Sequence, residues 1–298
     1  MTDLAEIIRC PRCGGGLDAA LACGRCGSVY ERVGGRPVLI DFAASIFTPA
    51  DCSRPAVEGR GSAAGRLIAR ITFGTNQAAA RNLRRFLEAA GGGSDRPRIL
   101  VIGGGTVGDG ADLLYAASGV DLVGTDVYPS AHVALLCDAH KLPFADGAFD
   151  GVVIQAVLEH VLDPAAVAAE VHRVLKPAGI VYAETPFIQQ VHMGAYDFTR
   201  FTLSGHRWLF RNFEQIDAGA VLGPGTALLW SIFYYLRALL GRKVATLGTF
   251  LFAWVRLADR ARPSRAALDA ACGVYFLGRR SERSLAPSDM SAYYEALG

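Results

Sequence analysis

The sequence predicts an α/β protein in which a doubly wound, Rossmann-like sheet follows a small cysteine-rich head. An apolar strand over 98–102 leads into the glycines at 103–108 and then into a helix, and strands alternate with helices as far as residue 184. Four of the seven cysteines lie within residues 10–26. At 298 residues the chain is long enough for one large domain and one small one.

Charge is distributed unevenly along the chain. The formal net charge is +2, but residues 99–224 carry 6 basic and 14 acidic side chains. Both flanks are basic. Residues 61–98 carry 7 basic and 2 acidic side chains, and residues 225–265 carry 7 basic and 1 acidic. An acidic centre argues against a protein that grips nucleic acid over its whole surface. Because the N-terminus lacks a secretory signal, we expect a reduced, cytoplasmic compartment, with contact at the inner membrane face left open.

The cysteine cluster has metal-ligand spacing. Two C-x-x-C pairs, nine residues apart, are formed by Cys10, Cys13, Cys23 and Cys26. Zn²⁺ prefers four such ligands at tetrahedral corners, and four thiolates leave no position for a substrate. The sequence therefore predicts a structural zinc site. A disulfide framework is the weaker alternative because the chain shows no secretory signal.

The strings around these cysteines, together with Gly35-Arg-Pro-Val-Leu39, resemble a short bacterial zinc-ribbon family related to the activator subunit of tRNA and protein methyltransferases. The resemblance implies a β-rich ribbon with an interaction role, and we assign it residues 1–47. Residues 48–70 have linker composition, and the second domain is expected over 71–298. A helix over 76–90 is expected to lead this second domain, with an arginine face that is either solvated or meets phosphate.

The glycine-rich turn indicates a nucleotide-binding fold. Gly103, Gly104 and Gly105 follow the first strand, where a turn without side chains lets a ligand approach the backbone. A second strand, over 120–126, ends at Asp126, whose carboxylate can accept hydrogen bonds from both ribose hydroxyls. Both NAD and S-adenosylmethionine (SAM) have this requirement, so these residues alone leave the cofactor open.

The sequence motifs that follow distinguish between these two cofactors. A strand expected over 151–155 is preceded by Leu142-Pro-Phe-Ala-Asp-Gly-Ala-Phe-Asp150 and followed by Leu-Glu-His at 158–160. Further on, a helix over 164–175 is separated from a strand over 180–184 by Lys176-Pro-Ala-Gly179. In this order they resemble the small-molecule branch of the class I SAM-dependent methyltransferases, over about 75–220 plus a strand at 273–277. The resemblance implies a seven-stranded sheet whose last strand is antiparallel.

The resemblance also implies a set of cofactor-binding residues. Gly103 to Gly105 would pass under the methionine part of SAM, Asp126 with Val127 would hold the ribose, and Gln155 would hold the methionine end. Asp138 and the Ala139 N–H would bind the adenine edge. Val101 stands where the family usually has an acid. The methionine ammonium would then need backbone carbonyls or another acid.

Catalytic candidates follow the fourth and fifth strands, at the carboxyl edge where such sheets bind ligands. His160 is one, and a loop after residue 185 offers the others. We expect His192 or Asp197 as a base and Arg200 as an anion or lid anchor. The alternatives are that His160 only braces the pocket and that an Asp197–Arg200 salt bridge only orders the loop. The absence of an Asn/Asp-Pro-Pro-Tyr/Phe string argues against adenine N6 or glutamine as acceptor.

A helical insertion, 225–270, precedes the last strand. Two apolar helices are expected at 226–240 and 244–257, and each is short against a bilayer core of about 30 Å. A membrane-interface hairpin over 226–257, a homodimer interface, a lid over the substrate and ordinary buried helices all remain open.

Together these observations predict a methyltransferase that uses SAM and structural Zn²⁺ and acts on a small-molecule, sugar or lipid-linked acceptor. Two alternatives remain. One is an RNA methyltransferase with a zinc-ribbon head, disfavoured by the acidic centre but kept open by the basic stretch at 61–98. The other is a non-catalytic SAM-binding scaffold protein.

Overall fold

A computed structural model of the chain describes residues 4–54, 76–260 and 264–297. Most of the predicted linker, the predicted start of the second domain at residue 71, and Arg262 of the basic stretch lie outside the described residues.

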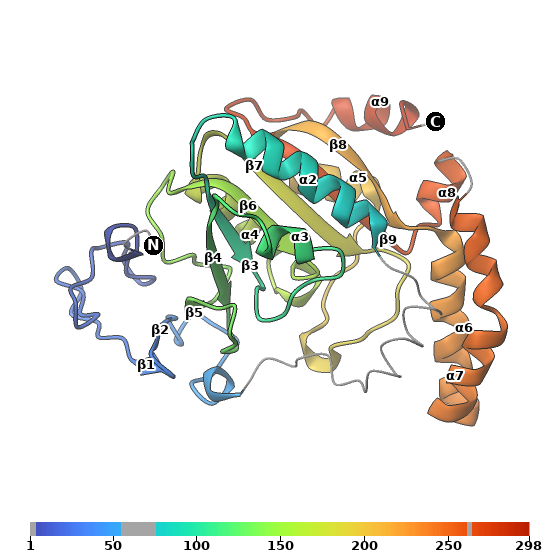
Figure 1. Cartoon of the computed structure of the whole chain (residues 1–298), viewed down its shortest axis with the longest axis horizontal. Helices are drawn as coiled ribbons and strands as arrows, with labels where there is room; N and C mark the ends of the chain where they lie inside the picture. Colours follow the sequence, from blue (N-terminus) through green and yellow to red (C-terminus); the bar gives the residue numbers. More distant parts are fainter. Residues whose placement is uncertain (1–3, 55–75, 261–263, 298) are drawn as a thin grey trace.

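One mixed sheet organises the molecule, in the order β1-β2-β5-β4-β3-β6-β7-β9-β8 (Figure 1). Its strands are β1 (Arg32–Val33), β2 (Arg36–Leu39), β3 (Arg98–Ile102), β4 (Asp121–Asp126), β5 (Leu135–Cys137), β6 (Phe149–Gln155), β7 (Leu175–Pro186), β8 (Phe213–Leu222) and β9 (Gly273–Arg280). From β5 to β8 this is the predicted seven-stranded sheet. β3 runs parallel to β4 and β6, whereas β9 runs antiparallel to both neighbours, so the predicted fold class is confirmed.

The two additional strands come from the cysteine-rich head. β2 pairs parallel with β5, and β1 pairs with β2. Ile7, Ile8 and Leu21 of the head share one buried cluster with Phe149 of β6 and with Phe144, which precedes that strand. Because the sheet and its core continue into the head, head and body are packed as one structure over the described residues.

Helices cover both faces of the sheet (Figure 1). They are α2 (Gln77–Gly91), α3 (Asp112–Tyr115), α4 (Pro164–Val174), α5 (Leu203–Leu209), α6 (Pro224–Leu240), α7 (Arg242–Leu251), α8 (Arg265–Asp269) and α9 (Asp289–Glu295), with short 3-10 turns η1 (Leu4–Glu6), η2 (Asp51–Ser53), η3 (Leu158–His160), η4 (Gly194–Tyr196) and η5 (Ala253–Arg260). Successive β3 residues alternate between the two cores: Ile99 packs with α2 and α3, and Leu100 packs with α4.

Two predicted helices differ from the observed ones. The helix expected after the glycine turn is a single turn, α3, because Gly110 has φ +83°, outside the helical region. In the insertion, α6 begins at Pro224, earlier than expected, since proline is tolerated in the first helical turn. The Asp259 carboxylate accepts hydrogen bonds from the N–H groups of Gly225 and Thr226 at that end.

Gly241, with φ +82°, reverses the chain between α6 and α7. α7 ends at Leu251 and the 3-10 turn η5 follows, so the helix expected to reach residue 257 is shorter. The two helices stand side by side at one end of the sheet (Figure 1). Among the described residues, no helix meets the length and hydropathy needed to cross a bilayer.

Candidate active site

Two adjoining cavities open at the carboxyl edge of β3, β4, β6 and β7 and share Ile102, Gly103, Thr106 and Ala156. The first, of about 330 Å³, is lined among others by Gly105, Asp126, Val127, Asp138, Ala139 and His160. The second, of about 390 Å³, is lined among others by Asn76, Asp109, Gln155, Glu159, Glu184 and His192. The structure therefore brings together the predicted cofactor-binding residues except Gly104, which lines neither cavity and whose N–H donates to the Thr125 carbonyl.

The turn after β3 requires glycine at its first position. Gly103 has φ +75°, and a Cβ there would lie 2.2 Å from a methyl of Val157. Two residues later, the Gly105 N–H donates to the Asp126 carboxylate at 2.9 Å. The turn is thereby tied to the end of β4.

Asp126 is positioned by three backbone donors. Besides Gly105, the N–H groups of Val127 and Tyr128 donate to its carboxylate at 2.7 and 3.0 Å. Burial raises the pKa of Asp126, and these three hydrogen bonds act in the opposite direction. The carboxylate lines the 330 Å³ cavity, where the predicted ribose role requires it. The role itself stays a prediction.

The head contributes to the same cavity, which the sequence did not indicate. Ser45 donates to the carboxylate of Asp138, which also pairs with His140 at 2.6 Å. Burial opposes ionisation of Asp138, but the hydrogen bonds from His140 and Ser45 outweigh it and lower its pKa. Phe47 stacks on Tyr196 with ring centroids 5.6 Å apart, and both rings line the cavity.

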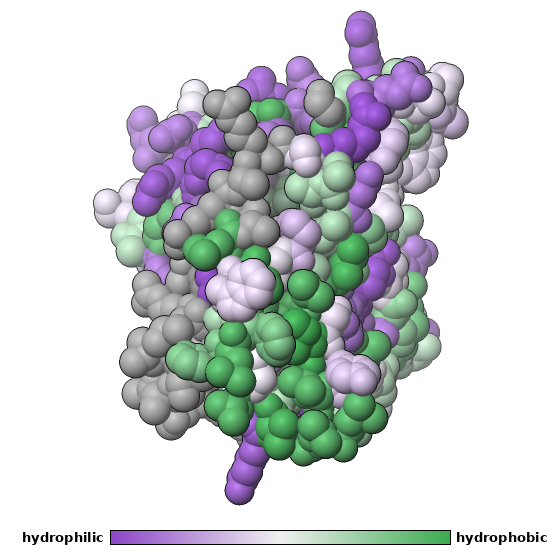
Figure 2. All heavy atoms as spheres, turned by 90° about the vertical axis from the view of Figure 1, so that its right-hand side faces the viewer, coloured by the Kyte–Doolittle hydropathy of each residue, from purple (hydrophilic) through white to green (hydrophobic). Residues whose placement is uncertain are grey.

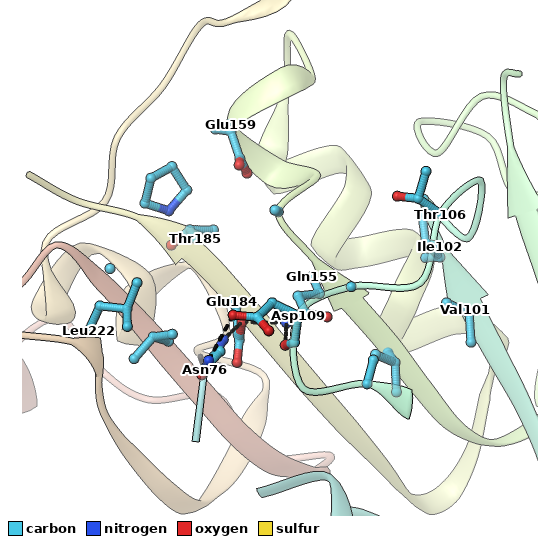
Figure 3. Close-up of a pocket in the computed structure, with 18 of the residues that line it drawn as sticks. Asn76, Val101, Ile102, Thr106, Asp109, Gln155, Glu159, Glu184, Thr185 and Leu222 are labelled. Atoms are coloured by element: carbon cyan, nitrogen blue, oxygen red, sulfur yellow. Dashed lines mark hydrogen bonds between the residues drawn. The ribbon is translucent and has the colours of Figure 1, made fainter. Parts of the chain in front are cut away.

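In the second cavity, Glu184 accepts three side-chain hydrogen bonds. Gln155 and Asn76 donate at 2.8 and 2.9 Å, and the Tyr182 hydroxyl donates to the other oxygen. Figure 3 shows Glu184, Asn76, Gln155 and Asp109 gathered at the floor of the cavity. Burial raises the pKa of Glu184 to about 7, although the hydrogen bonds lower it. Position 101, two residues before the glycine turn, is Val101 and supplies no acid. Glu184 instead places a carboxyl group in this cavity.

We expect this buried acid to make stability depend on pH. A carboxyl group with a folded pKa near 7, against about 4.5 when unfolded, stabilises the folded protein fully below pH 4.5. That stabilisation, of about 2–3 kcal/mol, is lost as the pH rises to 7. Urea unfolding at pH 5 and pH 7.5 should therefore show a smaller pH-dependent loss in Glu184→Gln than in the wild type. Glu214→Gln, exposed on β8, is the control, and equal losses in all three proteins would refute the expectation.

Glu159 is a functional candidate that the sequence analysis did not single out. It is fully buried on η3, and neither carboxylate oxygen has a hydrogen-bond partner. Burial raises its pKa to about 8. The Nε2 atoms of His160 and His192 lie 3.6 and 4.0 Å from one of its oxygens. Figure 3 shows its carboxylate directed into the cavity. The sequence showed Glu159 next to His160 in the Leu-Glu-His motif. The third member of the cluster, His192, comes from a distant loop, and only the structure shows that it lies beside them.

Asp197 and Arg200 lie outside the two cavities and hold the loop in place. Arg200 pairs with the Asp197 carboxylate and donates to the carbonyls of Gln189 and Gln190 at 2.9 and 3.0 Å. These contacts, the Arg200 hydrogen bond foremost, hold the pKa of Asp197 well below its usual range. A carboxylate in this state is a weak base, so the geometry favours the loop-ordering role for the pair.

The four cysteines of the head converge as their spacing predicts. Their Sγ atoms all lie within 4.8 Å of one another, with Cys10–Cys26 at 3.6 Å and Cys13–Cys23 at 3.5 Å. Tetrahedral Zn²⁺ with bonds of about 2.3 Å separates its sulfur ligands by roughly 3.8 Å. The arrangement therefore fits one zinc ion.

Comparison with known proteins finds matches to part of the chain. Residues 100–183 match the family model described as a methyltransferase domain. The ubiquinone/menaquinone biosynthesis C-methyltransferase UbiE of Desulfotalea psychrophila is 28% identical over 151 residues, 51% of this chain and 54% of the relative. UbiE of Paraburkholderia xenovorans is 38% identical over 88 residues, 29% of this chain and 35% of the relative. The chain spans about half the length of the first relative and less of the second.

Solved structures that resemble this chain do so at low identity and low structural similarity. Phosphoethanolamine N-methyltransferase 2 of Haemonchus contortus, in complex with SAM, is 16% identical with a TM-score of 0.49, covering 74% of this chain and 58% of that one. A complex of the Haloferax volcanii Trm112 methyltransferase activator with a methyltransferase is 16% identical with a TM-score of 0.43. The match covers 72% of this chain and 98% of that one.

The strand order, the antiparallel β9 and the glycine turn after β3 define a class I, Rossmann-like methyltransferase fold. With the domain match over 100–183, the chain carries a class I SAM-dependent methyltransferase domain.

Proposed function

We propose that this protein transfers a methyl group from SAM to a small-molecule acceptor, such as a sugar or a lipid-linked compound. The supporting observation is the pair of adjoining cavities: one is lined by Asp126 and Asp138, and the other by Gln155 and Glu184. In this proposal Asp126 holds the ribose, Asp138 and Ala139 contact the adenine, and Gln155 with Glu184 contacts the methionine end. The acceptor occupies the remainder of the second cavity.

When bound, SAM supplies a methyl group activated by a sulfonium. Its transfer is an in-line displacement that depends chiefly on positioning. Tyr196 and Phe47 stack on each other and line the first cavity. An oxygen acceptor must also lose a proton, and Glu159, His160 and His192 are titratable groups in the walls of the two cavities.

Calorimetric titration with SAM tests the proposal. We expect a dissociation constant in the micromolar range, and no heat of binding at millimolar SAM would overturn it. Salt-dependent binding of RNA, with no methyl transfer to sugars or lipids, would instead favour the RNA methyltransferase. SAM binding without transfer to any acceptor class would favour the scaffold.

We also propose that the four cysteines of the head bind one structural Zn²⁺ ion. The support is the approach of four thiols to distances that suit one tetrahedral ion.

The insertion supports a further proposal: that the acceptor is met at an anionic membrane surface. α6, α7 and η5 expose many large apolar side chains, seen as a green area in Figure 2. They are Leu228, Tyr235, Leu239, Leu240, Val244, Leu247, Phe250, Leu251, Phe252, Trp254 and Leu257. Residues 225–265 carry 7 basic and 1 acidic side chains, which complements anionic head groups.

We expect the protein to float with liposomes rich in anionic lipid and to remain at the bottom with neutral ones. Leu247→Glu with Phe250→Glu should abolish flotation, because it places charge at the centre of the apolar surface. Leu162→Glu with Val29→Glu, exposed apolar residues elsewhere, is the matched control. Protein that stays at the bottom with every liposome but elutes as a dimer in light-scattering chromatography would identify the surface as a homodimer interface.

A further inference from the structure

The Glu159 carboxylate is buried without a partner at the junction of the two cavities. Its side chain is 1% exposed, and neither oxygen accepts a hydrogen bond from any described residue. Burial without a hydrogen bond is unfavourable for a carboxyl group in either protonation state, and most unfavourable when the group is ionised. Such a group is retained in a cavity wall when something that enters the cavity pairs with it.

Two imidazoles face this carboxylate. The Nε2 atoms of His160 and His192 lie 3.6 and 4.0 Å from the same Glu159 oxygen, and the three ligand atoms all lie within 4.8 Å of one another. An ion with bonds of about 2.0–2.2 Å separates neighbouring ligands by roughly 3.0–3.5 Å. Small side-chain rotations therefore close the three atoms around one ion.

The other nitrogen of each imidazole is already engaged. His160 Nδ1 lies 2.6 Å from the Tyr196 carbonyl, to which it can only donate. His192 Nδ1 lies 3.4 Å from the Asp197 carboxylate, which Arg200 fixes in turn. Donation from Nδ1 leaves the lone pair on Nε2, directed at Glu159. Metal-binding histidines show this same support from a carbonyl or carboxylate.

We propose that Glu159, His160 and His192 bind one divalent first-row transition cation, such as Mn²⁺ or Zn²⁺, separate from the four-cysteine site. Two nitrogen ligands and one oxygen suit these cations better than Mg²⁺, which prefers oxygen throughout. Glu159 and His192 line the 390 Å³ cavity, so the open coordination positions face the space for the acceptor. Asp197 and Arg200 are positioning residues for His192.

This part of the inference rests on the proposed methyl transfer. A cation at this site favours an acceptor that has a hydroxyl group. The hydroxyl oxygen binds the cation, which lowers the pKa of the hydroxyl, and its proton leaves to solvent. The oxygen then forms a bond to the methyl carbon while the carbon–sulfur bond breaks and its electron pair returns to sulfur. The products are a methyl ether and a neutral thioether.

The test is a Mn²⁺ titration of the zinc-loaded full-length protein, followed by the loss of the free Mn²⁺ signal in electron paramagnetic resonance. A site of four thiolates does not take up Mn²⁺ readily, so the head does not contribute. We expect one Mn²⁺ per chain in the wild type, and binding at least about tenfold weaker in Glu159→Gln and in His192→Ala. Asp197→Asn should weaken binding by about 10-fold or more, as loss of an outer partner does.

His132→Ala, an exposed histidine outside both cavities, is the control and should bind like the wild type. SAM titration of each variant shows whether it is folded. It also separates a failure of the proposed metal site from a failure of the proposed methyl transfer. Wild-type protein that binds SAM but leaves millimolar Mn²⁺ free would overturn the metal site alone. Equal Mn²⁺ binding by Glu159→Gln and the wild type would overturn it as well.

Discussion

Cys13→Ser, or removal of zinc by a chelator, is expected to destabilise the whole protein and not the head alone. Binding of structural Zn²⁺ contributes about 10–16 kcal/mol to folding in small zinc modules. In this chain β2 of the head pairs with β5, and Ile7, Ile8 and Leu21 belong to the core of the sheet. Loss of the ion should therefore expose the sheet edge and lower the single melting temperature by more than about 10 °C.

Calorimetric scans with and without chelator measure this effect, and elemental analysis should find zinc in the wild type but not in Cys13→Ser. Cys52→Ala, a buried cysteine outside the cluster, is the matched control and should lose only about 1–2 kcal/mol. Because Ser45 of the head contacts Asp138, chelation should also weaken SAM binding. A methyltransferase domain that melts at the same temperature after chelation would show that the head folds as an independent domain.

Asp126→Ala is expected to weaken SAM binding by about 100-fold or more. In the proposed role, its carboxylate accepts hydrogen bonds from two ribose hydroxyls, and hydrogen bonds to a charged group are worth about 1.5–3 kcal/mol each. The substitution also leaves the N–H groups of Gly105, Val127 and Tyr128 without their acceptor. Asp126→Asn keeps an oxygen for some of these donors, so it should give an intermediate loss.

Asp121→Ala is the control for this prediction. Asp121 begins the same strand, pairs with Arg98 at 3.3 Å and lies at the opposite end of β4 from the cavity. Its substitution should leave the SAM dissociation constant within about twofold of the wild type. If calorimetry finds equal affinities for Asp126→Ala and Asp121→Ala, Asp126 does not bind the cofactor.

The parts of the site that could be predicted are those encoded by short spacings. The C-x-x-C pairs, the glycine turn at Gly103 and the acid at the end of β4 each lie within one local segment. Local backbone geometry determines where such residues point, so a pattern of a few residues is sufficient. The seven-stranded sheet with its antiparallel last strand was expected for a different reason, the resemblance of the ordered sequence motifs over about 75–220 to a known family.

The partners of Gln155, His192 and Asp138 could not be predicted. Gln155 meets Glu184 because β6 and β7 are in register, and His192 meets Glu159 because the loop ordered by Asp197 and Arg200 folds back over η3. Ser45 reaches Asp138 across 93 positions of sequence. None of these pairs has a characteristic spacing, since each depends on how separate segments pack.

The sequence by itself determined the class of fold, the convergence of the four cysteines and the polar and glycine residues expected to contact the cofactor in the first cavity. Only the tertiary structure decided that the head extends the sheet, that Glu184 supplies the acid absent at Val101, and that Glu159 lies buried between two imidazoles. The physical reason is burial: whether a carboxylate is solvated, paired or left without a partner depends on the surrounding segments, and no single segment contains that information.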